Sequence, residues 1–321
     1  MSVKVRTADG DAIREAAQIL ARGGLVAFPT ETVYGLGVDA TNGDAVARLF
    51  AVKQRPSINP LIIHVRDFAS AERVAFFHPL AWRLAERFWP GALTLVLPLK
   101  RDAGISLLAN AGLETVALRV PSHPTAQRLL ALSELAIAAP SANPSGRISP
   151  TRAAHVAGDL GEKIDLLIDD GPSALGIEST VIGFEGNRAV LLRAGAIGRD
   201  VIEPITGPTA LPCFGNRPSA PGQLASHYSP RAQLRLEARS VSKQEALLAF
   251  GPDVPPGGVQ TLNLSARANL AEAAANLFAM LRCLDASGTR TIAVMPIPRE
   301  GLGEAINDRL ERAAAPREPL S

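Results

Sequence analysis

The sequence predicts an α/β fold that is divided into two domains. Short apolar runs of strand length alternate with segments in which apolar residues recur at helical spacing. This alternation is typical of a sheet covered by helices. Six prolines fall between residues 204 and 230 and interrupt both patterns. Since 321 residues are also about twice the length of an ordinary domain, we expect a larger domain over residues 1–205, a linker over 206–231 and a smaller domain over 232–321.

The larger domain is predicted to begin with an amphipathic helix. Ile13, Ala16 and Leu20 share one face of the segment Asp11–Arg22, and the glycine pair that follows is a typical helix stop. Similar patterns predict helices over Asp44–Val52, Pro79–Phe88, Pro124–Leu132 and Thr151–Ala157. Short apolar runs predict strands over Leu25–Phe28, Leu61–Val65, Leu93–Leu97, Thr115–Val120, Ala136–Ala139, Lys163–Ile168, Thr180–Phe184 and Ala189–Arg193. The last strands follow one another without a helix, so we expect a twisted, mixed sheet with an antiparallel part.

The smaller domain repeats the same alternation after the linker. Its predicted strands are Gln233–Glu237, Val259–Leu264 and Thr291–Met295, and its predicted helices are Lys243–Phe250, Leu270–Leu284 and Ala305–Ala314. We therefore expect a second, compact α/β domain.

Composition excludes several classes of protein. Only two cysteines occur, Cys213 and Cys283, which argues against a disulfide framework or a structural zinc site and fits a reducing, cytoplasmic location. No apolar run is long enough to span a bilayer, and the N-terminus lacks the pattern of a signal peptide. A net charge of +2 is too small for a protein that binds nucleic acid through charge alone.

The usual sequence motifs of nucleotide sites are missing. Neither GxxxxGK[ST] nor GxGxxG following a strand is present, and GxSxG and HExxH are also absent. Four polar loops instead follow or precede predicted strands, at the edge where open α/β sheets bind ligands. These loops are Pro29–Thr32, Lys53–Pro60, Ala139–Gly146 and Gly176–Thr180. Any phosphate would have to be bound by side chains that the fold brings together.

Two arginines, Arg119 and Arg193, interrupt otherwise apolar strands. A buried arginine needs an anionic partner, and a substrate carboxylate or phosphate in a cleft would provide one. Structural ion pairs would explain both residues equally well. The polar loops also have an ordinary interpretation as turns, the cations after Val52 as complements of a helix dipole, and His64 as a hydrogen-bonded core residue. The residues alone therefore predict a cleft without naming its ligand.

Taken in order, these segments resemble the YrdC-like family. The similarity rests on GGLVAFPTETVYGLGVDA, VKQRPSINPLIIHV, PGALTLVL, VALRVPSHP, APSANPSG, GIESTVIGF and LLRAGAIG, which together cover about residues 10–200. The segment APGQLASHYSPRA further resembles the linker of the family's long, two-domain form. This resemblance implies a YrdC-like catalytic domain followed by a smaller, Rossmann-like α/β domain.

The resemblance also implies a reaction. L-Threonine and bicarbonate, or dissolved CO2, would form a carbamate that attacks the α-phosphorus of ATP, giving threonylcarbamoyl-adenylate and pyrophosphate. Mg2+ would bridge phosphate oxygens, and no protein side chain is expected as a metal ligand. A separate transferase machinery would then modify tRNA, with weak direct tRNA binding also expected. Cationic side chains would offset the repulsion between the two anions.

Site residues follow from the same resemblance. The expected threonine contacts are Thr32, His64, Arg119 and Ser179, and the expected ATP contacts are Arg55, Asn59, Ser141, Ser149, Arg193 and Tyr228. Lys53, Arg55 and Arg193 are the candidate catalytic cations on the phosphate side. Arg119 would bind the amino-acid carboxylate, and Thr32 and Ser179 would bind its amine and hydroxyl.

The linker is expected to act as a flap in which His227 and Tyr228 close over ATP and exclude water from labile intermediates. A passive tether is the alternative. Two other functions compete with adenylate formation. One is an RNA-binding module, although aromatic residues make up only 4% of the chain. The other is carbamoylation in hydrogenase maturation, which would require acylphosphatase-like and zinc-finger segments that this sequence lacks.

Overall fold

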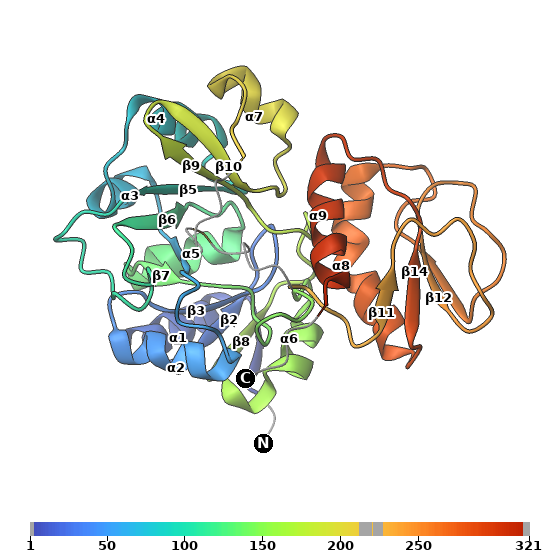
Figure 1. The fold of residues 1–321 in the computed structure, drawn as a ribbon. Helices are drawn as coiled ribbons and strands as arrows, with labels where there is room; N and C mark the ends of the chain where they lie inside the picture. Colours follow the sequence, from blue (N-terminus) through green and yellow to red (C-terminus); the bar gives the residue numbers. More distant parts are fainter. Residues whose placement is uncertain (1–2, 212–219, 221–226, 317–321) are drawn as a thin grey trace.

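The structure, a computed structural model, describes residues 3–211, 220 and 227–316. Its elements form two lobes, a larger one built from the N-terminal part of the chain and a smaller one built from the C-terminal part (Figure 1). Each lobe contains a β-sheet with helices packed against it. The predicted α/β fold class, with a mixed sheet and a second, smaller α/β domain, is therefore confirmed.

The larger lobe is built on one mixed sheet. Among the described residues its strand order is β1-β8-β2-β3-β7-β4-β6-β5-β9-β10. The strands are β1 (Val5–Thr7), β2 (Val26–Phe28), β3 (Gly35–Asp39), β4 (Ile62–His64), β5 (Leu93–Pro98), β6 (Thr115–Arg119), β7 (Ile137–Ala138), β8 (Leu166–Asp169), β9 (Thr180–Glu185) and β10 (Arg188–Arg193). β9 and β10 are antiparallel neighbours, as predicted for consecutive strands without a helix between them. β4 and β6, in contrast, run parallel.

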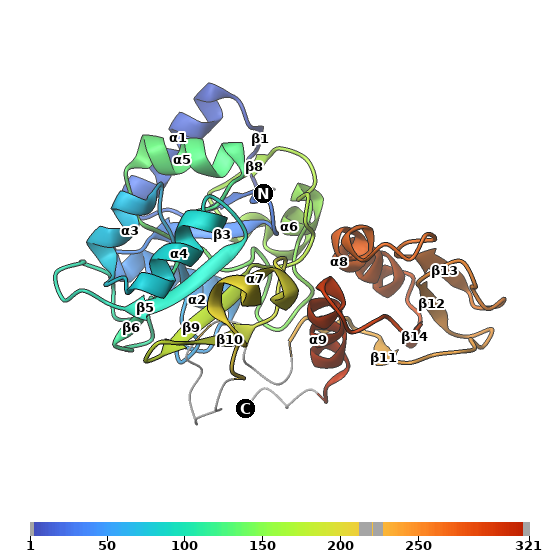
Figure 2. The same cartoon turned by 90° about the horizontal axis from the view of Figure 1, so that it is seen from above.

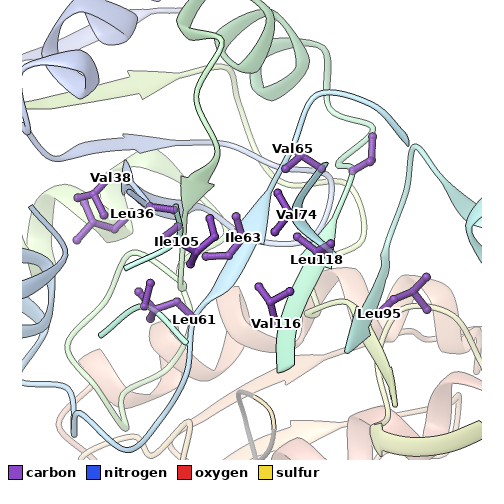
Figure 3. Close-up of a cluster of buried hydrophobic side chains, with 14 of the residues drawn as sticks. Leu36, Val38, Leu61, Ile63, Val65, Val74, Leu95, Ile105, Val116 and Leu118 are labelled. Atoms are coloured by element: carbon purple, nitrogen blue, oxygen red, sulfur yellow. The ribbon is translucent and has the colours of Figure 1, made fainter. Parts of the chain in front are cut away.

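Helices cover both faces of this sheet. They are α1 (Gly10–Ala21), α2 (Gly43–Lys53), α3 (Phe68–Val74), α4 (Pro79–Phe88), α5 (Pro124–Ser133), α6 (Ala153–Asp159) and α7 (Arg199–Thr206). On one face, Ile13 of α1 lies in the same apolar cluster as Phe28 of β2. On the other face, Leu49 of α2 shares a larger cluster with Leu36 of β3, part of which is drawn in Figure 3. The alternation of side chains along each strand thus supplies two cores.

The smaller lobe is a four-stranded parallel sheet, in the order β11-β14-β12-β13, with two long helices. Its elements are β11 (Gln233–Arg235), β12 (Ala246–Ala249), β13 (Gln260–Asn263), α8 (Leu270–Ala286), β14 (Thr291–Val294) and α9 (Leu302–Ala314). Both views show α8 and α9 between this sheet and the larger lobe (Figures 1 and 2). The helices therefore form the surface through which the two lobes meet.

The interface between the lobes is a continuous apolar core. Val33, Ile148 and Ile177 of the larger lobe are buried in the same cluster as Leu277 and Phe278 of α8. Ion pairs surround this core: Arg282 with Asp159 at 2.5 Å, Arg309 with Glu178 at 2.8 Å and Arg199 with Glu304 at 2.6 Å. Since buried apolar surface and paired charges both cross the interface, the lobes are packed together rather than merely tethered.

Several predicted elements differ in the structure. The predicted helix over Lys243–Phe250 is wrong, because Ala246–Ala249 forms strand β12 in the middle of the smaller sheet. The predicted strand Lys163–Ile168 begins only at Leu166, after a 3₁₀ turn over Gly161–Lys163. Elements β1, β3, α3 and α7 were not predicted.

The predicted linker over residues 206–231 is described only in part. Residues 212–219 and 221–226, on which most of the predicted flap falls, lie outside the described residues. The boundaries at 205 and 231 stay predictions. No helix within the described ranges has the length and apolar character needed to cross a membrane.

Candidate active site

One cavity in the larger lobe gathers most of the predicted site residues. It encloses about 590 Å³ of empty space, counting the part open to solvent. Its lining includes eight of the predicted residues: Thr32, Arg55, His64, Arg119, Ser141, Ser179, Arg193 and Tyr228. Residues from Thr30 to Tyr228 in the sequence thus meet around a single space.

Arg119, at the end of β6, is fixed in the cavity wall by three neighbours. Nη1 donates to Thr32 Oγ1 at 2.9 Å, and Nε donates to the carbonyl of Gly91 at 3.1 Å. Nη2 lies 2.7 Å from Glu31 Oε1 as a buried ion pair. Burial alone would raise the pKa of Glu31, but the charge and hydrogen bond of Arg119 outweigh it and lower the pKa. Both charges are therefore retained in the wall of the cavity.

His64 lies beside this arginine, because β4 and β6 pair His64 with Arg119 in register. Its side chain is buried, and Nδ1 has no hydrogen-bond partner among the described residues. Burial, with a further contribution from the charge of Arg119, lowers the pKa of His64 to about 3. The imidazole is therefore neutral at physiological pH, with one buried nitrogen still to be satisfied by a ligand or water.

Ser179, just before β9, and Arg193, at the end of β10, form a second fixed group. Arg193 Nε and Nη2 donate to the carbonyl of Ser179 at 3.1 and 2.8 Å, and Nη2 also donates to its hydroxyl at 3.1 Å. The same hydroxyl lies 2.7 Å from Thr94 Oγ1. Gly195 permits this approach, because a Cβ at that position would lie 2.4 Å from the carbonyl carbon of Ser179.

Arg55 reaches the cavity from the loop after α2. Nε donates to the carbonyl of Asn59 at 3.0 Å and Nη2 to that of Pro60 at 2.8 Å. Burial lowers the pKa of Arg55 to about 10, so the guanidinium stays charged near neutral pH. Carbonyl partners hold the side chain without neutralising its charge, which leaves a cation available to an anionic ligand.

Three predicted site residues do not line the cavity: Lys53, Asn59 and Ser149. Lys53 is buried behind the wall, where Nζ donates to the carbonyls of Ser141, at 2.6 Å, and of Asn143. Ser149 donates to Glu178 Oε1 at 2.5 Å. Asn59 is buried, and its side-chain amide has no partner among the described residues. The ammonium of Lys53 is therefore placed to hold the Ala139–Gly146 loop rather than to contact a ligand directly.

Sequence reasoning missed several residues that shape the site. Glu178 lines the cavity, and Glu31 and Arg309 lie directly behind it. His227, which was predicted as part of the flap over ATP, also lines the cavity. Both glutamates belong to loops that were predicted to carry the site, so their negative charge was a usable signal. Burial, followed by the charges of Arg55 and other nearby cations, lowers the pKa of His227 well below its ordinary value. Arg309, on a helix of the smaller lobe, gave no such signal.

The electrostatics of the cavity favour an anion. Three arginines, Arg55, Arg119 and Arg193, line it, whereas Glu178 is its one acidic lining residue among those described. Within the described ranges no group of three or more His, Cys, Asp or Glu side chains is placed to hold a metal ion. The fold and the site thus define an α/β enzyme that binds small, negatively charged substrates in a buried, arginine-lined cavity.

Comparisons with known proteins agree with this description. Residues 18–195 match the Sua5/YciO/YrdC family, described as telomere recombination, and residues 197–315 match the threonylcarbamoyl-AMP synthase C-terminal domain. The chain is 42% identical to a threonylcarbamoyl-AMP synthase of Bacillus subtilis, with 95% of this chain and 93% of the relative covered. It is 40% identical to the corresponding protein of Pyrococcus abyssi, with 95% and 94% covered.

A solved structure extends the similarity to the whole fold. The crystal structure of P. abyssi Sua5 complexed with L-threonine superposes with a TM-score of 0.88 at 37% identity, over 97% of this chain and 96% of that one. The chain therefore belongs to the threonylcarbamoyl-AMP synthases, a family of nucleotidyltransferases, in their long, two-domain form. The resemblance to the YrdC-like family is confirmed, and the alternative of an RNA-binding module without adenylation activity is not favoured.

Proposed function

We propose that this chain converts L-threonine, bicarbonate and ATP into L-threonylcarbamoyl-AMP, pyrophosphate and water. With dissolved CO2 in place of bicarbonate, the same products form without water. The observation that carries the proposal is the single buried cavity lined by Arg55, Arg119 and Arg193. The carbamate formed from threonine and the triphosphate of ATP are both anionic, so they repel each other unless cations are fixed around them. A cavity with three guanidinium groups and one acidic lining residue, among those described, meets that requirement.

Threonine is assigned to the Arg119 side of the cavity. The guanidinium would bind the substrate carboxylate, and Thr32 and Ser179 would bind the amine and hydroxyl. His64, which is neutral, has a nitrogen to share with the same substrate. The complex of P. abyssi Sua5 with L-threonine supports an amino-acid site in a protein of this fold.

ATP is assigned to the part of the cavity lined by Arg55, Arg193, Ser141 and Tyr228. The unsatisfied amide of Asn59 lies next to Arg55 and would be available to the nucleotide after a small side-chain shift. Ser149 would act through Glu178 or reach the nucleotide after reorientation. Lys53 would serve as a positioning residue for Ser141.

Mg2+ is proposed to enter with ATP rather than to occupy a site built by the protein. Glu31 is paired with Arg119, and Glu178 is paired with Arg309 and bonded by Ser149, so neither carboxylate is uncommitted. Mg2+ often binds through substrate phosphates and water. When bound, the ion would supply charge neutralisation on the phosphate oxygens.

The protein's contribution to the chemistry is positioning and charge. The carbamate oxygen attacks the α-phosphorus, the bond to the bridging oxygen breaks, and pyrophosphate leaves with the electron pair. No side chain has to form a covalent intermediate, because the carbamate is itself the nucleophile. Arg55 and Arg193, which are held by carbonyl groups, stabilise the charge that shifts toward pyrophosphate.

The product implies partners that the chain itself does not contain. We propose that threonylcarbamoyl-AMP passes to a tRNA-threonylcarbamoyl transferase machinery in the cytoplasm. Direct tRNA binding would be weak, because the net charge is only +2.

Release of pyrophosphate tests the proposed function. The protein is mixed with ATP, Mg2+, bicarbonate and one amino acid at a time, and pyrophosphate is measured. We expect release that requires both L-threonine and bicarbonate. Steep, salt-dependent tRNA binding without ATP binding would favour the RNA-binding module instead, and release that is independent of the amino acid would contradict the proposal.

A further inference from the structure

Arg309, on helix α9 of the smaller lobe, reaches the wall of the cavity in the larger lobe. Its side chain is fully buried, and Nε donates to Glu178 Oε2 at 2.8 Å. Nη2 donates to the carbonyl of Ala194 at 2.9 Å, next to Arg193 in the chain. Its guanidinium carbon lies 5.0 Å from the ring centre of Tyr228. One side chain from the smaller lobe therefore contacts two residues that line the cavity, Glu178 and Tyr228, and the backbone next to a third, Arg193.

The loop that carries Glu178 is also held by backbone contacts on two sides. A Cβ at Gly176, whose φ is +67°, would lie 2.4 Å from the carbonyl oxygen of Ala275 in α8. On the other side, a Cβ at Gly195 would lie 2.5 Å from the carbonyl oxygen of Glu178. Ile177, between them, is buried in the core of the smaller lobe. Helix α8 therefore forms part of the support for this loop.

Charged groups also hold the loop that carries Glu178. Burial alone would raise the pKa of Glu178, but Arg309 and then Arg193 outweigh it and lower the pKa. The buried Tyr228 also faces the guanidinium of Arg309, and Nη1 of Arg309 donates to the carboxylate of Asp308. The charged Glu178 in turn accepts a hydrogen bond from Ser149. Without Arg309, a buried carboxylate would lose its closest cation, which is costly.

We propose that Arg309 is a positioning residue for ATP binding, through which the smaller lobe fixes Glu178, Ser149 and the end of β10 at the nucleotide side of the cavity. This proposal rests on the assignment of ATP to that side. Arg309 itself does not line the cavity, so its effect is transmitted through the residues that it holds. The smaller lobe is then part of the frame of the active site and not a separate binding module.

Binding measurements on the full chain test the proposal without requiring turnover. The variant Arg309→Met is titrated with ATP and, separately, with L-threonine by calorimetry. We expect the Kd for ATP to rise by about 10- to 100-fold, the size of effect expected when a buried hydrogen bond between charged groups at the site is lost. The Kd for L-threonine should change less than about twofold. A loss of folded protein lowers the number of binding sites and leaves Kd unchanged, so this difference is not produced by instability.

A matched control is available on the same lobe. Arg299 forms an exposed ion pair with Glu311, and 67% of its side chain is accessible to solvent. Since exposed pairs contribute little, Arg299→Ala should leave both Kd values and the melting temperature unchanged. Arg309→Lys keeps the charge but loses the planar fork, so it should recover part of the ATP affinity.

The double variant Arg309→Met/Glu178→Gln tests the same proposal if Arg309→Met alone does not fold. It removes both buried charges, so its melting temperature should be higher than that of Arg309→Met. Its Kd for ATP should stay raised, by about the factor seen for Glu178→Gln alone, because the two residues act as one unit. Wild-type affinity for ATP in the double variant would overturn the proposal. So would an equal rise in both Kd values in Arg309→Met.

The two proposals fail in different ways. Absence of threonine-dependent pyrophosphate release from the wild-type protein would overturn the proposed function. Normal release, together with an unchanged ATP affinity in Arg309→Met, would overturn only the positioning role of Arg309.

Discussion

His64 on β4 lies directly opposite Arg119 on β6, so a neutral ring and a fixed cation stand side by side in the cavity wall. Their pairing follows from the parallel register of the two strands. The arginine supplies charge and directional donors, whereas the histidine supplies a nitrogen without charge. A zwitterionic amino acid can bind to both kinds of group, because its carboxylate pairs with a cation and its ammonium group donates hydrogen bonds to acceptors.

Arg119→Ala is predicted to raise the KM for L-threonine by about 10- to 100-fold, the equivalent of one charged hydrogen-bond interaction. The KM for ATP should change far less, because Arg119 is proposed to bind threonine and not ATP. Steady-state pyrophosphate release, with each substrate varied in turn, measures both constants. Arg66→Ala removes an exposed arginine that pairs with Asp67 and serves as the control. A larger change for ATP than for threonine would reverse the assignment of Arg119.

The stability of the protein is predicted to fall as the pH drops below about 6.5. The folded state holds His64 with a pKa of about 3, lowered mainly by burial, whereas an unfolded histidine has a pKa near 6.5. Between these two pKa values the unfolded chain binds a proton at His64 that the folded protein does not bind. The free energy of unfolding therefore increases as the pH rises and decreases as the pH falls. The contribution of His64 is at most about 1.4 kcal/mol per pH unit.

Urea denaturation at several pH values between 5 and 7 measures this dependence. His64→Gln should show a shallower decline than the wild-type protein, and the decline should not vanish, because His155 and His227 also have lowered pKa values. His78→Gln, at a less buried ring, should change the slope less. An unaltered slope in His64→Gln would show that His64 does not titrate as described.

The sequence predicted most elements of the larger lobe, and its failures have physical causes. The segment over Lys243–Phe250 contains good helix formers, yet Ala246–Ala249 forms a strand. This strand is buried on both faces of a parallel sheet, where strands are apolar throughout and lose the alternation by which they are recognised. Strand β3 was hidden by glycines. A Cβ at Gly37 would lie 2.7 Å from the ring of Phe28, so the packing itself requires glycine.

The sequence predicted some of the residues that line the cavity and missed others that shape it, and the reason is again physical. Arg119 and Arg193 were conspicuous because each is a charge in an apolar strand, and both line the cavity. Lys53 was predicted as a catalytic cation, but its side-chain nitrogen is occupied by carbonyl groups behind the wall. Arg309 contacts Glu178 across 131 positions of the sequence. No local pattern marks a contact that depends on how two lobes pack.

Lys53→Met is predicted to disturb the Ala139–Gly146 loop and to raise the KM for ATP by about 10-fold, because two carbonyls lose their hydrogen-bond donor. Hydrogen exchange of the amides from 141 to 145 should become faster in the variant. Lys100→Met, at a lysine that lies over the ring of Phe76, is the control and should change neither measurement. A fall in kcat with unchanged exchange would instead show that Lys53 contacts the phosphates directly.

Tyr228→Ala is predicted to lower turnover and to increase hydrolysis of the adenylate intermediate, because the buried aromatic residue lines the cavity and its loss would admit water. The ring is stacked on Phe278, at 5.6 Å between centres, and its backbone has a φ of +62°, which a non-glycine residue adopts only when its surroundings hold it there.

Burial raises the pKa of the Tyr228 hydroxyl to about 12, so the group stays neutral and the ring itself is expected to matter most. Tyr228→Phe should therefore keep most of the activity, and release of free AMP per pyrophosphate formed measures the leakage. If Tyr228→Ala turned over normally and released no more AMP than wild type, the segment around Tyr228 would be a passive tether.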